Sequence, residues 1–84
     1  MRTLHLVRKR RDEFALSVLK RQGGYDEVTC VLLQDAVLSP PDLPVPCYAL
    51  REDVEARGTS LSIPLIDMHR LVEMIFEHDS IICW

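Results

Sequence analysis

The chain has 84 residues, of which 48% are hydrophobic and 27% are charged. A chain of this length buries only roughly 60–65% of its unfolded surface, so we expect residues 1–84 to form a single domain that gains stability by association. Its apolar runs are far shorter than the roughly 20 residues that span a bilayer. The apolar stretch behind Arg2 ends at Arg8, too early for a signal peptide, so we expect a soluble, cytoplasmic protein.

The charges are distributed unevenly along a chain whose formal net charge is -3. Residues 1–21 contain seven Lys or Arg against two acidic residues, whereas residues 22–84 contain three against eleven. This asymmetry favours binding of a partner in one orientation.

The first two predicted elements are a strand and a helix. Residues 2–8 alternate in side-chain character and place Leu4 and Leu6 on one face of a strand. Residues 12–21 then follow a helical pattern with acidic residues first and basic residues last. The pair Gly23-Gly24 ends this helix, because glycine adopts the left-handed cap conformation without a Cβ clash.

The middle of the chain predicts two further strands with little helix between them. Residues 28–33 are β-branched and almost continuously apolar, which is typical of a strand covered on both faces. Residues 34–46 hold four of the five prolines, so we expect an irregular connection with a turn at residues 34–38. Residues 45–50 form the third predicted strand.

The last part of the chain alternates again. We expect a helix of under two turns at residues 51–57, ended by Gly58, and a short strand at residues 63–66. Asp67 can cap a third helix, and residues 80–84 form a terminal strand. The apolar positions of that helix follow the spacing of one helix face: Met68, Leu71, Val72, Ile75 and Phe76.

This alternating order predicts an α/β fold of three layers, α/β/α. The sheet should be mostly parallel, with about five strands, right-handed crossovers and helices on both faces. There is no internal repeat, low-complexity segment or linker in the sequence.

The common catalytic and cofactor motifs are missing from the sequence. Gly23-Gly24 follows a helix, whereas phosphate-binding glycines lie between a strand and the next helix. There is no G-x-S-x-G motif. The histidines His5, His69 and His78 are not at metal-ligand spacing from the cysteines. We therefore expect no cofactor and no metal, with His5 a core or interface histidine.

The three cysteines, Cys30, Cys47 and Cys83, are spaced 17 and 36 residues apart and include no C-x-x-C pair. We expect reduced thiols rather than a disulfide framework. Cys30 and Cys47 lie in predicted strands, where apolar burial raises the pKa of a thiol and suppresses its reactivity. Cys83 is more accessible but has no neighbouring cation in the sequence.

Two further features leave alternatives open. The basic run Arg8, Lys9, Arg10 and Arg11 follows the first strand and either contacts RNA phosphate or an acidic partner, or is a solvated loop. Asp35 follows the second strand and either receives a cation from a partner or forms a local turn.

Four segments together resemble one protein family. They are Leu4-His5, then Leu32 to Val37 (LLQDAV), then Tyr48 to Gly58 (YALREDVEARG), and finally Trp84. This pattern resembles the DsrH/TusB family of sulfur-relay subunits. The four segments occur in the same order as in the family and span almost the whole chain.

The resemblance implies a DsrE/DsrF/DsrH-like fold and assembly with DsrE/TusD-like and DsrF/TusC-like partners. In such complexes a persulfide cysteine on the DsrE/TusD subunit carries sulfur, destined for 2-thiouridine at the tRNA wobble position or for sulfur oxidation. The chain would contact tRNA only indirectly. The resemblance also implies loop or interface roles for Asp35, Arg57 and Trp84.

The chain departs from the family pattern in two places. A gap-free reading places Lys20 where some DsrH members have a cysteine in the first helix, and the stretch from Ser39 to Pro46 is shorter than the usual second helix. We therefore expect a non-catalytic subunit without an activated cysteine. The alternatives are a small sulfurtransferase that uses Cys83 or Cys47, and a homo-oligomeric structural or regulatory protein.

Overall fold

The computed structural model describes residues 1–23 and 27–84. Within these residues strands and helices alternate, and none of the helices is long and apolar enough to cross a membrane. In chain order the elements are β1 (Arg2–Val7), α1 (Glu13–Gln22), β2 (Glu27–Leu32), the 3-10 helix η1 (Gln34–Leu38), β3 (Cys47–Leu50), α2 (Arg51–Ala56), β4 (Leu65–Ile66), α3 (Met68–Glu77) and β5 (Ser80–Cys83).

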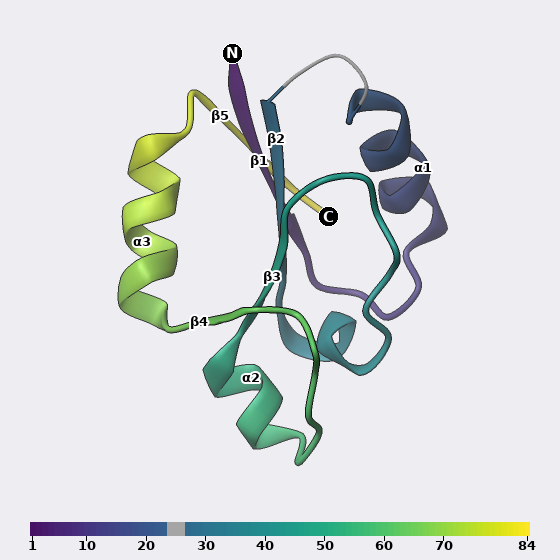
Figure 1. The fold of residues 1–84 in the computed structure, drawn as a ribbon, viewed down its shortest axis with the longest axis vertical. Helices are drawn as coiled ribbons and strands as arrows, with labels where there is room; N and C mark the ends of the chain where they lie inside the picture. The colour runs from purple at the N-terminus through teal and green to yellow at the C-terminus, as the bar shows by residue number, and fades with distance from the viewer. Residues whose placement is uncertain (24–26) are drawn as a thin grey trace.

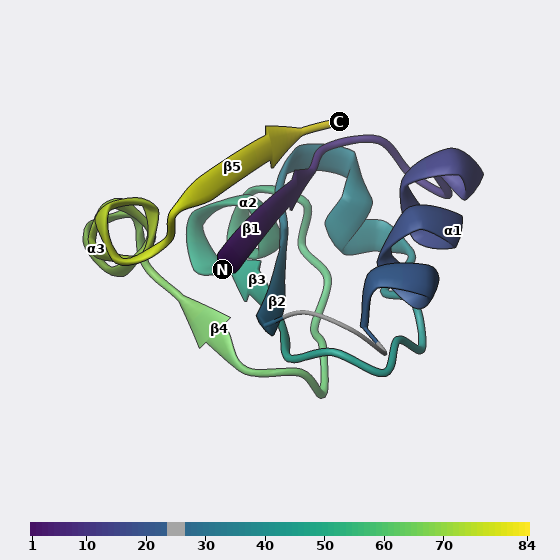
Figure 2. The ribbon, with the colours of Figure 1, turned by 90° about the horizontal axis from the view of Figure 1, so that it is seen from above.

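The five strands form one parallel sheet in the order β4-β3-β2-β1-β5. The apolar strand β2 lies in the middle, as its composition predicts, because a central parallel strand is covered on both faces. Helices α1 and α3 lie on opposite sides of the sheet, with α2 near one end (Figures 1 and 2). The predicted three-layer α/β fold is confirmed.

Each face of the sheet has its own core. Side chains alternate along β1, so that Val7 joins the cluster beneath α1 while Leu4 and Leu6 join the cluster beneath α3. Irregular chain completes the layer on the α1 face: Leu43 and Ile63, from loops on either side of β3, pack against that cluster. The proline-rich connection therefore covers the sheet without being helical.

The strands after the proline-rich connection are shorter than predicted. Strand β3 begins at Cys47, where its pairing with Cys30 of β2 begins, and β4 begins at Leu65, where its pairing with Ala49 of β3 begins. The predicted turn at residues 34–38 is confirmed as η1.

The first residue after helix α1 differs in conformation from the prediction. Gly23 is the C-cap, but its φ of -57° and ψ of -18° are right-handed, so the left-handed cap is wrong for this residue. A Cβ at Gly23 would lie 2.8 Å from Val45 Cγ1, so glycine is required by a close approach. Gly24, the other predicted cap residue, lies outside the described residues. Gly58, after α2, does have a positive φ of 61°.

Helix α3 presents more apolar surface than the sheet covers. Its predicted cap is confirmed, because the Asp67 side chain accepts a hydrogen bond from the backbone N–H of Arg70 at 2.8 Å. Leu71 and Met74 are buried. Three of its predicted apolar positions are instead exposed by 49%, 45% and 84%, and we call them the α3 stripe: Met68, Val72 and Phe76.

Candidate functional site

The carboxyl ends of the strands meet at one edge of the sheet, because the strands are parallel. The loops after β1 and β2 are joined there, since Leu33 N donates to Val7 O at 2.8 Å and Ala36 N donates to Arg8 O at 3.2 Å. Ligands of open α/β sheets bind at this edge. We define the carboxyl edge by Arg8, Lys9, Arg10, Arg11, Asp35, Arg57 and Trp84.

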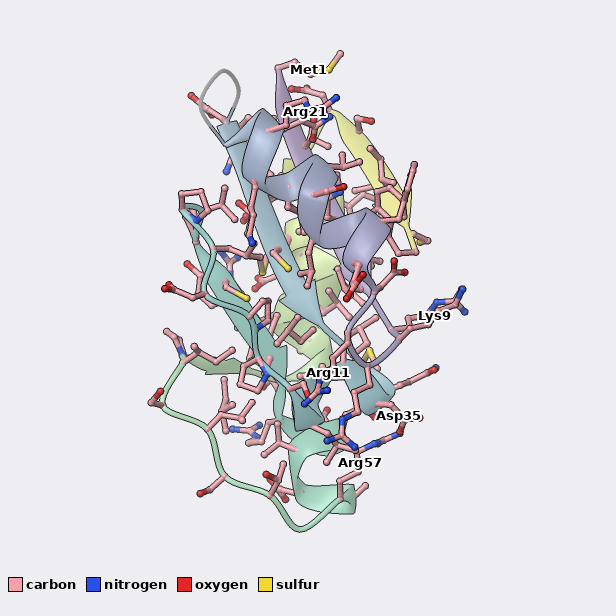
Figure 3. The ribbon with its side chains drawn as sticks, turned by 90° about the vertical axis from the view of Figure 1, so that its right-hand side faces the viewer. Met1, Lys9, Arg11, Arg21, Asp35 and Arg57 are labelled. Atoms are coloured by element: carbon pink, nitrogen blue, oxygen red, sulfur yellow. The ribbon has the colours of Figure 1, made fainter. Side chains whose placement is uncertain are left out.

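Two predicted site residues meet at the carboxyl edge. Arg57, at the end of α2, donates from Nε to Asp35 Oδ1 at 3.0 Å, and its Nη1 lies 3.6 Å from Asp53 Oδ1 (Figure 3). Asp53 in turn accepts from the backbone N–H of Gln34 at 2.7 Å. These contacts hold Gln34 in a left-handed conformation with a φ of 49°. Asp35 is therefore a partner of Arg57 within the chain.

Two arginines of the basic run form hydrogen bonds within the chain. Arg8 Nε donates to Trp84 O and Arg10 Nε donates to Ser39 Oγ, both at 2.9 Å. Arg11 has a φ of 55° and lies at the same end of the molecule as Asp35, whereas Lys9 extends outward (Figure 3). The run is exposed, so it presents positive charge at the carboxyl edge.

Trp84 is held by contacts with the start of the chain. Its backbone N–H donates to Leu6 O at 2.9 Å, and its Nε1–H donates to His5 Nδ1 at 3.0 Å. The indole is nearly coplanar with the His5 ring, with 9° between the planes and 6.1 Å between centroids, and meets the ring of Phe14 edge-on at 5.5 Å. Trp84 thus closes the α1 face beside β1.

These contacts fix the tautomer of His5, a residue that is fully buried. An indole N–H can only donate, so Nδ1 must accept and the proton lies on Nε2, which donates to Gln22 Oε1 at 2.7 Å. Burial lowers the pKa of His5, and the hydrogen bond with Gln22 opposes this shift. His5 is the satisfied core histidine that the sequence predicts.

Lys20 is not part of this arrangement. It is exposed in the last turn of α1, next to Arg21. Arg21 lies near Met1, at the end of the molecule opposite Asp35 and Arg57 (Figure 3). Lys20 is therefore distant from the carboxyl edge.

The other end of the sheet holds a pocket of about 300 Å³, lined in part by Arg2, Glu27, Pro44 and His78. None of the predicted site residues lines it. Arg2 Nε lies 3.5 Å from Glu27 Oε2, so charges here pair with one another.

Cys83 is exposed on the edge strand β5, opposite Leu6 of β1. Residues paired in register lie on the same face, so Cys83 lies on the α3 face of the sheet with Leu6. No hydrogen bond to its thiol occurs among the described residues.

Cys30 and Cys47 are direct partners in the register of β2 and β3. Cys30 is fully buried, whereas Cys47 is only partly buried against the same cluster. Hydrogen bonding between the two side chains raises the pKa of Cys30, a rise that burial increases, and lowers the pKa of Cys47 against the effect of burial. The sequence predicts the same behaviour for both thiols, whereas in the structure they differ in burial and in the direction of their pKa shifts.

Sequence reasoning missed two groupings. The contact of His5 with Trp84 joins residues 79 positions apart, and the Cys30–Cys47 pair depends on a register set across an irregular connection. The apolar run of β2 indicates a central strand but not the residue that faces Cys30. A strand-register prediction for β2 and β3 would have found the pair.

Comparison with known families gives one match. A family model described as DsrH like protein matches residues 16–81. The matched segment runs from within α1 into β5 and includes Asp35, Arg57, Cys30 and Cys47. No curated protein matches the chain.

Proposed function

This chain belongs to the family of DsrH-like proteins and is thus a sulfur-relay subunit, and on that premise we propose that it is the companion chain of a complex with DsrE/TusD-like and DsrF/TusC-like subunits. The observation that carries this proposal is the family match over residues 16–81. In the proposed complex, a persulfide cysteine on the DsrE/TusD-like chain carries the sulfur.

The α3 stripe supports assembly with other chains. Exposed apolar side chains on one helix face are a feature of protein interfaces. Phe76 is 84% exposed, which is unfavourable for an aromatic ring in water. We propose that the stripe packs against a DsrE/TusD-like or DsrF/TusC-like partner.

The subunit itself does not hold the relay sulfur in this proposal. Lys20 replaces the cysteine that some family members carry in the first helix, and Cys30 is fully buried. The chain instead supports the partner's cysteine through Asp35, Arg57 and Trp84 at the carboxyl edge.

The proposal leaves two downstream routes: 2-thiouridine synthesis in tRNA, and sulfur oxidation. The family match does not distinguish between them. We also propose a cytoplasmic location, which the three free cysteines support, because reduced thiols persist in reducing compartments.

A second candidate function is favoured by one observation. Hydrogen bonding with Cys30 lowers the pKa of Cys47, which would favour the thiolate that a sulfurtransferase needs. Cys83 is the more exposed thiol and is the other acceptor in this alternative.

Co-purification from the native cells tests the assembly. The tagged protein should elute with DsrE-like and DsrF-like chains, identified by mass spectrometry and sized by light scattering. Elution of the protein only with itself would contradict the proposed complex and support the homo-oligomer.

Sulfur loading tests the role of the subunit within the complex. After incubation with a cysteine desulfurase and cysteine, a DsrE-like partner should gain one sulfur atom while this chain keeps its mass. Cys47→Ala and Cys83→Ala are the matched variants. A sulfur adduct on this chain that one of them abolishes would establish the sulfurtransferase instead.

A further inference from the structure

The Cys30–Cys47 pair has the placement of a reactive dithiol. The two residues are opposed on neighbouring strands. Neighbouring strands lie about 4.8 Å apart, which falls within the roughly 4.4–6.8 Å between the Cα atoms of disulfide-bonded cysteines. Both side chains belong to the α1 face, where Cys30 is in the core and Cys47 packs against it. A bond between the two sulfur atoms therefore requires no change in strand register.

The two thiols differ in access. Cys30 is 0% exposed, so a reagent in solution cannot reach it directly. Cys47 is partly exposed at the first residue of β3. An external reagent therefore meets Cys47 first, with Cys30 behind it.

We propose that Cys30 and Cys47 form a thiol–disulfide exchange pair, in which Cys47 reacts with a low-molecular-weight disulfide and Cys30 then closes an intramolecular bond. The pairing in register and the unequal burial of the two thiols carry this assignment. The lowered pKa of Cys47 agrees with its role as the attacking thiolate.

The exchange takes place in two balanced steps. The Cys47 thiolate attacks one sulfur of the small disulfide RSSR, which forms a mixed disulfide, Cys47–S–S–R, and releases RS⁻. The Cys30 thiol then gives its proton to the released RS⁻, the Cys30 thiolate attacks the Cys47 sulfur, and the second RS⁻ leaves and takes up the proton that Cys47 had lost. The protein loses two hydrogen atoms and RSSR becomes two thiols, so no further oxidant is needed.

Cys83 is the internal control for this chemistry. It is exposed, so it reacts with the same reagent. It lies on the α3 face and cannot close a bond with Cys30 or Cys47 across the sheet. Substitution of Cys83 should therefore leave the exchange pair unchanged.

The test uses the full chain and oxidised glutathione as the probe. The reduced protein is incubated with graded amounts, quenched with an alkylating reagent and analysed by intact mass and peptide mapping. The Cys83→Ser variant should lose two hydrogen atoms and yield a linked Cys30–Cys47 peptide. A Cys83→Ser variant whose Cys30–Cys47 pair stays reduced would overturn the proposal. An unmodified chain that forms only a glutathione adduct on Cys83 would overturn it as well.

Single substitutions test the order of attack. Cys30→Ser should accumulate a stable glutathione adduct on Cys47, whereas Cys47→Ser should leave Cys30 unmodified because Cys30 is buried. Glutathione on Cys30 in the folded Cys47→Ser protein, shown folded by circular dichroism, would contradict the assigned order.

A comparison without substitutions guards against variants that fail to fold. In urea the unmodified chain should form all three pairings, with the shorter loops favoured by chain entropy, whereas the folded chain should link Cys30 only to Cys47. Equal linkage patterns in both conditions would remove the structural basis of the proposal. The inference is independent of the proposed function, since loss of partner binding leaves this exchange measurable.

Discussion

His5 is a buried histidine held in one neutral tautomer by two hydrogen bonds. Protonation of Nδ1 would place two donors, the ring N–H and the indole N–H of Trp84, against each other. Neutral His5 is thus part of the packing between β1, α1 and the end of the chain. The same side chain makes the stability of the protein sensitive to pH.

The first prediction concerns the stability of the protein at acidic pH. Burial lowers the pKa of His5 from its ordinary value of 6.5, so the unfolded chain binds this proton more readily than the folded one. The contribution of His5 to the free energy of unfolding is fully present above pH 6.5 and is lost as pH falls through the lower folded pKa. Urea unfolding at a series of pH values should show this decline.

The control for that experiment is His5→Gln, which cannot titrate. Its free energy of unfolding should be lower at neutral pH and should fall less below pH 6.5 than that of the unmodified protein. Equal pH dependence in both proteins would show that other groups cause the acid sensitivity.

The second prediction separates Arg57 from Asp35. The Arg57 side chain is 26% exposed and contacts two carboxylates, whereas that of Asp35 is 65% exposed. Arg57→Ala should lower the free energy of unfolding by about 1–2 kcal/mol, and Asp35→Asn by less than about 1 kcal/mol. Denaturant titrations measure both changes. Equal losses of unfolding free energy in the two variants would mean that Arg57 stabilises the protein only through its contact with Asp35.

At the scale of elements, the order of strands and helices follows from the sequence, because each element has its own pattern. The alternation in β1 and the apolar run of β2 are local signals. What could not be predicted depends on contacts between distant elements. Gly23 fits against Val45 of the proline-rich connection, and the sheet leaves the α3 stripe exposed. The residues of the candidate site were predicted only one by one. The contact between Asp35 and Arg57 could be recognised only in the folded structure.

The third prediction contrasts the glycines that follow two helices. Gly23→Ala places a Cβ 2.8 Å from Val45 Cγ1 and should cost about 1–3 kcal/mol through crowding. Gly58→Ala meets no atom within 4 Å, and its positive φ alone should cost about 1 kcal/mol. Adding Val45→Ala should relieve the crowding in the Gly23 variant only, as thermal unfolding of the double variants would show.

The fourth prediction concerns the α3 stripe. Phe76→Ser should change the free energy of unfolding by no more than about 0.5 kcal/mol, because the ring is exposed. The same change should weaken binding to a partner subunit about tenfold or more. Denaturant titration and a binding titration with the co-purified partner measure the two effects.

The matched variant for the stripe is Leu71→Ala, on the buried side of the same helix. It should cost about 2–4 kcal/mol of stability through the cavity that it leaves. Unchanged partner binding by Phe76→Ser would exclude the stripe as the interface.

At the scale of the whole molecule, the two ends of the chain form one structure. Strand β5 pairs with β1 from Thr3 to Leu6, and Trp84 covers His5. The sheet therefore depends on contacts between residues almost a full chain length apart. The stability of this edge of the sheet rests on the pairing of β5 with β1.

The fifth prediction tests this closure. Trp84→Ala removes the indole ring that packs against the core and the N–H donor to His5, and should lower the free energy of unfolding by about 2–3 kcal/mol. Phe14→Ala removes only a 70% exposed neighbour of the same ring and should cost less than about 1 kcal/mol. Circular dichroism measures the unfolding of both variants in guanidinium. Tryptophan fluorescence measures only that of Phe14→Ala, which keeps Trp84.

The pairing of β5 with β1 also has a consequence during translation. Strand β1 leaves the ribosome first and pairs with β2 soon afterwards, but its other edge has no partner until residues 80–83 have been synthesised. Unpaired strand edges bind other chains and promote aggregation. That edge of β1 therefore stays open while residues 8–79 are synthesised, and β5, which follows them, is the strand that closes it.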